Sequence, residues 1–243
     1  KNKMRKIDIE AERVFENRKA LGEDIRAAQN KFYWATDIDT KAHKEDTLKA
    51  INNKDILEIG CASGGDASDY VNYANSYIGL DISDEAIKNC KALELKNAEF
   101  FCVDGHIIPL EDQTLDYVVV TSLLHHLDIE KTFSEIDRVL KEGGSLIFLE
   151  PLGTNPLFQI YRFLTPKART DDERPFTFGD LRLMQSYFTF NEVRWFGFLN
   201  ILSAYIRIDA IRKLLTTFDR FLSKTFLKYF FWQFSGVAKK IQK

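Results

Sequence analysis

Cysteine, proline and methionine are scarce in this sequence of 243 residues, which contains 3, 5 and 2 of them. Cys61, Cys90 and Cys102 are odd in number and widely spaced, and no C-x-x-C pair occurs. This pattern argues against a disulfide framework and favours free thiols in a reducing compartment. No run of about 18 uncharged apolar residues is present, so we expect no membrane-spanning helix. Residues 1–20 are charged and lack the apolar centre of a signal peptide, so we expect a cytoplasmic protein.

A strong excess of charge is also absent, because 34 Lys and Arg residues stand against 36 Asp and Glu residues. The chain as a whole is not basic, and we expect no nucleic-acid partner. The charge is unevenly distributed: residues 1–150 carry 19 cations and 29 anions, whereas residues 151–243 carry 15 and 7. Twenty of the 32 aromatic residues also follow Pro151. This asymmetry indicates a second function in the C-terminal part of the chain.

Short apolar runs alternate with helical patterns between residues 54 and 151. The runs predict strands at 55–59, 77–81, 98–102, 115–121 and 145–150, and helices are expected near 65–74, 84–94 and 130–141. The Lys and Gly residues of KEGG, 141–144, are expected to end the last of these helices. Strands that alternate with helices predict βαβ units, a parallel sheet and right-handed crossovers.

The segments outside this core have less regular patterns. A charged helix is expected over 7–30, followed by the aromatic cluster KFYWA (31–35) and a polar helix near 40–51. After Pro151 we expect a loop with a short helix up to residue 176, a helix over 179–188, and strands over 191–199 and near 232–243. Between these strands, residues 201–230 predict one long helix or a helical pair. Its apolar positions are Ile208, Ile211, Leu215, Phe218, Leu222 and Phe226, and its opposite face carries Arg212, Lys213, Arg220, Lys224 and Lys228.

The stretch ILEIGCASGGDAS predicts a buried strand that runs into a glycine-rich turn. Glycines let a backbone approach a ligand closely, and amides at the start of the following helix can bind a carboxylate or a phosphate. Gly60, Ala62 and Gly65 fit a relaxed G-x-G-x-x-G, which is typical of NAD binding. Glu58, Gly60 and Gly64 fit the E-x-G-x-x-x-G of a methyl-donor site. The turn alone leaves both cofactors open.

Side chains at the ends of successive strands distinguish the two cofactors, because ligands of an open parallel sheet lie outside the strands' carboxyl ends. Asp81 ends the second strand about 20 residues after the turn, where its carboxylate can accept hydrogen bonds from both ribose hydroxyls and would repel the 2′-phosphate of NADP. Asp104 follows the third strand and can accept a hydrogen bond from the adenine amine. An NAD-dependent oxidoreductase explains the turn and Asp81 but not Asp104, and the sequence contains no Y-x-x-x-K pair.

These motifs resemble, in order, those of the class I S-adenosylmethionine-dependent methyltransferases over roughly residues 54–151. ILEIGCASGG resembles the first motif of that family, with Ala62 where a glycine is usual, and YIGLDIS resembles the acidic second motif. CVDGHIIPLEDQTLDYVVVTSLLHHL resembles the third and fourth motifs, and RVLKEGGSLIFLEP resembles the post-core motif. The resemblance implies S-adenosylmethionine as the cofactor and S-adenosylhomocysteine as the product.

The fold that the resemblance implies is α/β. It is a doubly wound, Rossmann-like, seven-stranded and mostly parallel sheet with N-terminal helices and a helical insertion between the last two strands. Residues 1–53 would form an N-terminal helical cap, and residues 54–151 would form the cofactor-binding core. Residues 152–243 would supply a substrate-side loop, the last two strands and the insertion within the same domain. Substrate specificity in this family generally resides in such additions.

The resemblance also implies a set of cofactor-binding residues. The methionine part would lie at Gly60, Cys61 and Gly64, with Glu58 in the same motif, ribose and adenine at Asp81 and Ile82, the adenine edge at Asp104, Gly105 and His106, and the sulfonium near Ser122 and Leu123. Tyr33 or Trp34 of the KFYWA cluster would cover the sulfonium through a cation–π contact. The alternative is that this cluster packs the N-terminal helix on the sheet.

A general base is needed if the acceptor is a hydroxyl. His125 and His126 of LLHHL are candidate bases, because an imidazole titrates near neutrality. Glu150, at the end of the fifth strand, is a further candidate base or an amine-orienting carboxylate. The alternatives are that one histidine only forms a hydrogen bond at a helix start, and that a nucleophilic acceptor needs no base. We expect no metal site, because adjacent histidines on a helix point in different directions.

The expected acceptor is a small or lipid-like metabolite, hydrophobic or anionic, methylated on oxygen, nitrogen or carbon. Arg162 and Arg169, with Lys167 and Arg174, flank a loop that can bind a carboxylate or phosphate, although a solvated loop with Arg–Asp pairs is the alternative. Residues 201–230 have three candidate roles besides core packing: a lid over a hydrophobic acceptor, a homodimer surface, or a peripheral membrane contact. A non-catalytic cofactor-binding or assembly protein also stays open.

Overall fold

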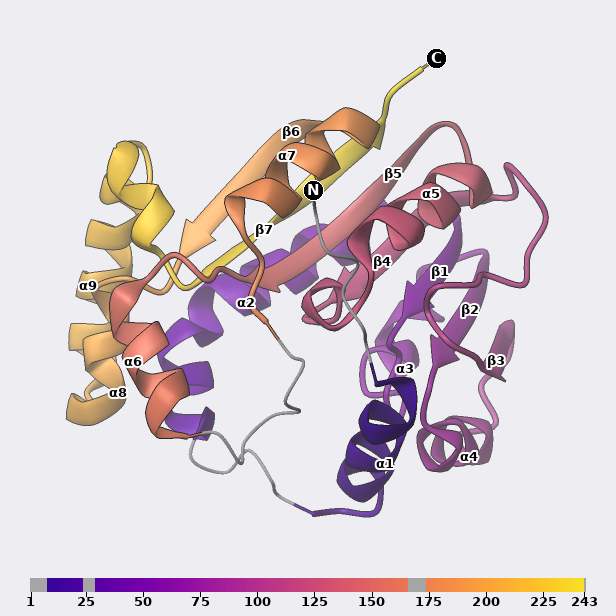
Figure 1. Cartoon of the computed structure of the whole chain (residues 1–243), viewed down its shortest axis with the longest axis horizontal. Coiled ribbons are helices and arrows are strands. Elements are labelled where there is room, and N and C mark those ends of the chain that lie inside the picture. The colour runs from indigo at the N-terminus through magenta and orange to yellow at the C-terminus, as the bar shows by residue number, and fades with distance from the viewer. Residues whose placement is uncertain (1–7, 24–28, 166–173, 243) are drawn as a thin grey trace.

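The computed structural model describes residues 8–23, 29–165 and 174–242. A seven-stranded sheet with the order β3-β2-β1-β4-β5-β7-β6 forms its centre (Figure 1). The strands are β1 (Asp55–Ile59), β2 (Ser76–Asp81), β3 (Ala98–Cys102), β4 (Leu115–Thr121), β5 (Leu140–Pro151), β6 (Phe188–Phe196) and β7 (Gln233–Lys240). Strands β1 to β5 are parallel, whereas β7 is antiparallel to both β5 and β6. The predicted doubly wound, mostly parallel fold is confirmed, as is an insertion between the last two strands.

The sheet changes direction at its middle strands. The chain proceeds from β1 outwards to β3 and then returns to place β4 on the other side of β1. The carboxyl ends of β1 and β4 are therefore the switch point at which open α/β sheets bind ligands. Ile56, Leu57, Val118, Val119 and Val120 of these strands are all completely buried. Both faces of the central strands are covered, which explains why they read as continuous apolar runs in the sequence.

Helices cover both faces of the sheet (Figure 1). They are α1 (Ile9–Ala20), α2 (Asn30–Ala50), α3 (Ala67–Tyr70), α4 (Asp84–Ala92), α5 (Ile129–Val139), α6 (Pro156–Leu164), α7 (Phe178–Tyr187), α8 (Ser203–Ile206) and α9 (Asp209–Leu222), with 3-10 segments η2 (Leu124–His126), η4 (Asn200–Leu202) and η5 (Phe226–Phe230). Helices α5 and α7 bury Phe133 and Met184 on one face. Helices α3 and α4 bury Tyr70 and Ile87 on the other. Among the described residues, no helix combines the length and the hydropathy needed to cross a membrane.

The N-terminal helices differ from the prediction. The helix predicted over 7–30 ends at Ala20, and Gly22 has a φ of +94°, a left-handed conformation that stops helices. Helix α2 already begins at Asn30, so the KFYWA cluster lies inside a helix and not before one. The reason is tertiary, because Phe32 and Ala35 are buried against the C-terminal part of the chain.

Two predicted helix ends within the core are also wrong. The helix expected over 65–74 is limited to α3 and continues only as turns, whose carbonyls at Val71, Ala74 and Asn75 accept from the Asn97 side chain. Helix α5 ends before KEGG, since Leu140 already pairs with β4 and brings these residues into β5.

The C-terminal insertion is more broken than the sequence predicts. Residues 201–230 form neither one helix nor a pair, but η4, α8, α9 and η5 in succession. Arg207 has a φ of +54°, which ends α8 and turns the chain before α9. The strand predicted over 191–199 starts earlier, at Phe188, because it pairs with β7 along its length.

Candidate active site

The glycine-rich turn after β1 has the backbone that its sequence predicts. Gly60 and Gly64 both have a φ of +81°, and Ala62 has a φ of +45°. A Cβ atom on Gly60 would lie 2.9 Å from Leu123, and one on Gly64 would lie 2.7 Å from Leu93. Gly60 therefore brings the turn against the LLHHL segment, whereas Gly64 seats the turn on α4. Ala62 adopts its left-handed conformation at a cost of about 1 kcal/mol relative to glycine.

Glu58 and Cys61 lie beneath the turn and not beside a cavity. Glu58 is 3% exposed, and its Oε2 accepts a hydrogen bond of 2.5 Å from the Tyr77 hydroxyl. Burial raises the pKa of Glu58 to about 8. Cys61 is also buried, and the thiol of Cys90 donates to the Ala62 carbonyl at 3.0 Å. These side chains support the turn from below.

Asp81 joins the turn to the end of β2. Its two carboxylate oxygens accept hydrogen bonds from the backbone N–H of Ala62 at 2.9 Å and of Ser83 at 2.8 Å. Burial raises the pKa of Asp81 from its ordinary value, against the effect of these two backbone donors. Each oxygen keeps a second lone pair, so the same carboxylate can accept from a ligand while it holds the turn.

Asp104 is oriented by His106. The backbone N–H of Asp128 donates to Nε2 of His106 at 2.7 Å, so the proton of this imidazole lies on Nδ1. Nδ1 in turn donates to Oδ1 of Asp104 at 2.5 Å, and the backbone N–H of His106 also donates to Oδ1. The hydrogen bond from His106 lowers the pKa of Asp104. His106 thus acts as a neutral support for a carboxylate that stays ionised.

The LLHHL segment is held by Glu150 from the neighbouring strand. Oε1 of Glu150 accepts from the backbone N–H groups of Leu123 and Leu124, both at 2.8 Å. Oε2 lies 2.8 Å from Nδ1 of His125. Glu150 is completely buried, and this burial raises its pKa to about 7. Neither Glu150 nor His125 lines a cavity described below, so both support the segment after β4.

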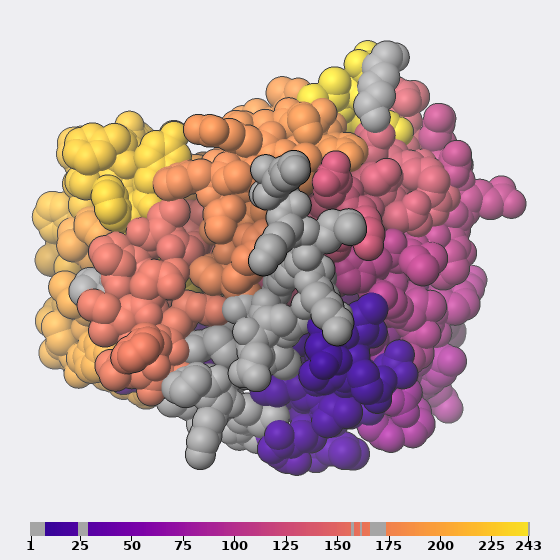
Figure 2. Space-filling model, in the orientation of Figure 1, coloured from indigo at the N-terminus to yellow at the C-terminus, as the bar shows by residue number. Residues whose placement is uncertain are grey.

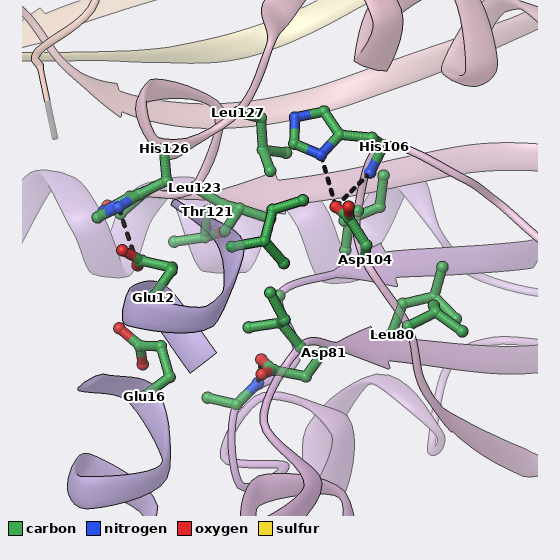
Figure 3. A pocket seen from close by; sticks show the side chains of 18 of the residues that line it. Glu12, Glu16, Leu80, Asp81, Asp104, His106, Thr121, Leu123, His126 and Leu127 are labelled. Atoms are coloured by element: carbon green, nitrogen blue, oxygen red, sulfur yellow. Dashed lines mark hydrogen bonds and ion pairs between the residues drawn. The ribbon is translucent and has the colours of Figure 1, made fainter. Parts of the chain in front are cut away.

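The acidic cavity lies at the switch point and has a volume of about 200 Å³ (Figure 3). Strand ends supply most of its lining: Ile59, Gly60, Ala62, Leu80, Asp81, Ile82, Val103, Asp104, Gly105, His106, Thr121, Ser122, Leu123, His126 and Leu127. Helix α1 covers it with Ile9, Glu12, Glu16 and Lys19. Figure 3 shows Glu12 and Glu16 on α1, across the cavity from Asp81 and Asp104. Four carboxylates and a single lysine give this cavity a negative potential.

His126 is the histidine of the pair that lines the acidic cavity. Its Nδ1 lies 2.9 Å from Oε1 of Glu12 on α1, and the two side chains are 6% and 11% exposed. The contribution of α1 was missed from the sequence. Ile9, Glu12, Glu16 and Lys19 have helical spacing, but a stripe of mixed charges normally indicates a solvated helix face.

The second cavity adjoins the first on the α2 side and has a volume of about 300 Å³. Its lining consists of Tyr33, Thr40, Lys41, His43, Lys44, Asp66, Tyr70, Thr121, Ser122, Leu149 and Gln233. Thr121 and Ser122 line both cavities, so the end of β4 separates them. Burial lowers the pKa of His43 to about 4, and this imidazole is neutral at pH 7.

The remaining predicted site residues are scattered. Tyr33 lines the second cavity, where its hydroxyl donates to Gln29. Trp34 lines neither cavity, and its ring stacks against the Arg212 guanidinium at 4.5 Å. Arg162 lies on α6. Arg169 and Lys167 lie outside the described residues.

The strand ends that line the acidic cavity lie in a part of the chain that is similar to a known protein family. Residues 57–148 match a family described as "Methyltransferase domain". This core is similar to methyltransferase domains, and we refer to it below as the methyltransferase domain. The match contains the glycine-rich turn, Asp81, Asp104 and the LLHHL segment, while α1 and the C-terminal insertion lie outside it.

Curated relatives of the methyltransferase domain include phthiotriol/phenolphthiotriol dimycocerosates methyltransferase 1 of Mycobacterium ulcerans. It is 29% identical over 119 residues, which are 47% of this chain and 44% of the relative. Sterol 24-C-methyltransferase of Schizosaccharomyces pombe is 32% identical over 96 residues, which are 37% of this chain and 25% of that protein. The chain therefore spans less than half the length of either relative.

Solved structures with the same fold match over more of the chain. The geranyl diphosphate C-methyltransferase of Streptomyces coelicolor, solved with Mg²⁺, geranyl diphosphate and S-adenosylhomocysteine, gives a TM-score of 0.65 at 14% identity, over 96% of this chain and 98% of that one. The YcgJ protein of Bacillus subtilis gives a TM-score of 0.60 at 14% identity, over 84% and 99%. At these identities the likeness extends to the fold alone.

Proposed function

We propose that this protein transfers a methyl group from S-adenosylmethionine to a small, lipid-like acceptor. The acidic cavity at the switch point of the methyltransferase domain carries the proposal. Its carboxylates suit the hydroxyl and amine groups of an adenosine and the positive charge of a sulfonium. The same carboxylates would repel the diphosphate of NAD, which argues against an oxidoreductase.

The strand-end residues can be given separate roles toward this cofactor, which supplies an electrophilic methyl group when bound. Asp81 would accept hydrogen bonds from the ribose, and Asp104, oriented by His106, would accept from the adenine amine. Gly60 and Ser122, at positive φ on two adjacent strand ends, would bring backbone close to the methionine part. These residues fit the adenosine and sulfonium groups, and none of the roles given to them requires a metal ion.

The second cavity is our candidate for the acceptor site. It meets the acidic cavity at Thr121 and Ser122, so an acceptor bound there would lie next to the cofactor. Its lining combines the aromatic Tyr33 and Tyr70 and the neutral His43 with the charged side chains of Lys41, Lys44 and Asp66. By their names, the relatives and neighbours act on a dimycocerosate, a sterol and geranyl diphosphate, which supports a lipid-like acceptor. The atom that receives the methyl group stays open among oxygen, nitrogen and carbon.

Binding of S-adenosylhomocysteine tests the cofactor assignment. We expect calorimetry to detect binding of S-adenosylhomocysteine and none of NAD. Asp104→Asn should weaken S-adenosylhomocysteine binding roughly 10- to 100-fold, because a hydrogen bond to a charged group contributes about 1.5–3 kcal/mol. Asp112→Asn is the matched control, since Asp112 is 72% exposed and pairs only with Arg138 among the described residues. Tighter binding of NAD, or equal effects of the two variants, would contradict the assignment.

His126 is the candidate base that the contacts favour. It lines the acidic cavity, and Glu12 next to its Nδ1 would orient the ring and leave Nε2 to accept a proton. His125 and Glu150 are instead engaged with one another beneath the segment, so we assign them a positioning role. This assignment applies if the acceptor is a hydroxyl or another group that must lose a proton.

Turnover of His126→Gln tests the base. We expect kcat for formation of S-adenosylhomocysteine, assayed over a panel of isoprenoid, sterol and phenolic lipid acceptors, to fall at least about 100-fold. The affinity for S-adenosylhomocysteine should stay unchanged, which separates a catalytic role from a structural one. Turnover like that of the wild type would exclude His126 as the base. If the wild type forms no S-adenosylhomocysteine with any acceptor, a non-catalytic binding protein becomes the better assignment.

A further inference from the structure

Helix α9 presents three large apolar side chains to solvent and buries two polar ones against the protein. Leu214, Phe218 and Phe221 are 56%, 51% and 69% exposed and, at spacings of four and three residues, form one stripe on its outer side. On its inner side, Thr216 and Asp219 are 2% and 1% exposed. A helix on the surface of a globular protein normally directs its apolar stripe to the core. Here the stripe is available to something outside the chain.

This orientation is held by polar contacts. Asp219 accepts hydrogen bonds from the backbone N–H groups of Phe198, Leu199 and Asn200, at 3.0, 2.8 and 3.2 Å. Arg212 donates to the Trp34 carbonyl at 3.0 Å, and Arg220 donates to the buried Asp39 at 3.2 Å. Rotation of α9 to bury its apolar stripe would break all of these bonds, so the stripe stays outside.

Neighbouring segments extend the stripe into a larger surface, which we call the apolar end surface. It comprises the exposed sides of α6, α8, α9 and η5, which Figure 1 shows together at the left end of the molecule. Phe163, Leu164, Tyr205, Phe218, Phe221 and Phe226 are each more than half exposed on it. Figure 2 shows α6, in salmon, and the part of the insertion around η5, in yellow, on this same end. Large exposed apolar side chains that gather at one end of a molecule are typical of an interaction site.

Aromatic contacts connect the apolar end surface with the second cavity. Helices α6 and α8 both pack on Phe32 of α2, with ring centroids 5.8 Å from Phe158 and 6.1 Å from Tyr205. Phe158 also stacks at 4.7 Å on Trp232, whose ring lies 5.9 Å from Tyr33 of the second cavity. The cavity and the surface are therefore parts of one structural unit.

The charge around the apolar end surface is positive. Residues 201–230 contain six Lys and Arg residues but only two Asp residues, and one of those, Asp219, is buried beneath α9. Lys213 and Arg220 are 68% and 55% exposed next to the apolar stripe. Apolar side chains bordered by cations are the pattern that binds the interface of an anionic bilayer. A second copy meeting this surface face to face would bring like charges together.

We propose that α6, α8, α9 and η5 dock the protein onto an anionic membrane surface. The phenylalanines would enter the headgroup region while Lys213 and Lys224 contact lipid phosphates. This inference deepens the proposed function, because it rests on a lipid-like acceptor that reaches the second cavity from the bilayer. It also explains why most of the aromatic residues, and an excess of cations over anions, are found after Pro151.

Vesicle flotation of the full chain tests this proposal. We expect binding to vesicles that contain phosphatidylglycerol, weaker binding to pure phosphatidylcholine, and release by salt. The double variant Phe163→Asp/Phe221→Asp and the double variant Lys213→Gln/Lys224→Gln should each lower binding to the anionic vesicles at least about tenfold, since each surface cation contributes about 1 kcal/mol. Leu21→Asp is the matched control and should bind like the wild type, because Leu21 is 70% exposed at the far end of α1.

The proposal would be overturned if the wild type did not bind anionic vesicles. It would also be overturned if both double variants bound these vesicles as strongly as the wild type does. Light scattering without lipid tests the other occupant, and a dimer that the phenylalanine variant converts into a monomer would assign the surface to a second copy. Thermal unfolding checks that the exposed substitutions leave the fold intact. Calorimetry with S-adenosylhomocysteine on the same samples separates failure of docking from failure of the proposed function.

Discussion

At the scale of single residues, the acidic side chains near the strand ends serve two kinds of purpose. Asp81 and Asp104 line the acidic cavity and at the same time hold backbone or a neighbouring ring in place. Glu58 and Glu150 have no access to the cavity, and burial raises the pKa of both. The sequence motifs contain all four carboxylates. Only the tertiary structure distinguishes the two that line the cavity from the two that support the backbone beneath it.

Glu58 should make the stability of the protein depend on pH. Its pKa rises from 4.5 to about 8 in the folded state, so the folded state prefers the protonated carboxyl. The stabilising contribution is complete below pH 4.5 and is lost as the pH rises through about 8. The difference in unfolding free energy between the wild type and Glu58→Gln, measured by urea denaturation from pH 4.5 to 8.5, should therefore fall by a few kcal/mol. A difference that stays constant over this range would contradict the prediction.

At the scale of secondary-structure elements, burial and capping contacts override the sequence patterns at several places. Helix α2 incorporates the KFYWA cluster because Phe32 and Ala35 meet the C-terminal part of the chain. Helix α1 covers the acidic cavity, although its sequence resembles a solvated helix. Helix α9 is amphipathic as predicted, but it buries Thr216 and Asp219 and leaves Phe218 and Phe221 exposed.

Asp219 should be essential for the position of α9. Replacing it with Ala leaves three buried or partly buried backbone N–H groups without their acceptor, which should lower the unfolding free energy by about 2–4 kcal/mol. The control is Asp209→Ala at the start of the same helix, where the half-exposed ion pairs with Arg212 and Lys213 should cost less than about 1 kcal/mol. Urea denaturation measures both values. Equal losses for the two variants would show that the buried capping contacts do not position the helix.

At the scale of the whole molecule, charge and function are segregated. The acidic part of the chain, residues 1–150, builds the acidic cavity, and the basic part after it builds the apolar end surface. This separation gives the molecule a positive end, which would approach an anionic surface first. The second cavity is lined mainly by the acidic part, from α2, β4 and β5 among others, and Gln233 of β7 is the lining residue from the basic part.

Most of the core fold, and many of the residues that line the acidic cavity, could be predicted from the sequence. Strand positions follow from apolar runs, because the central strands are buried on both faces. Eight of the predicted cofactor residues line the acidic cavity: Gly60, Asp81, Ile82, Asp104, Gly105, His106, Ser122 and Leu123. They were predictable because parallel strands bring their carboxyl ends to one edge of the sheet.

Other features depend on contacts between distant segments, which no local pattern contains. The roles of Glu12, Glu150 and the second cavity, and the direction in which α9 faces, were decided only by the tertiary structure. A heptad-like or strand-like pattern records that one side of an element is apolar. The pattern does not predict whether that side faces the core or the solvent. The orientation depends on polar contacts with distant residues, such as the hydrogen bonds from backbone N–H groups to Asp219.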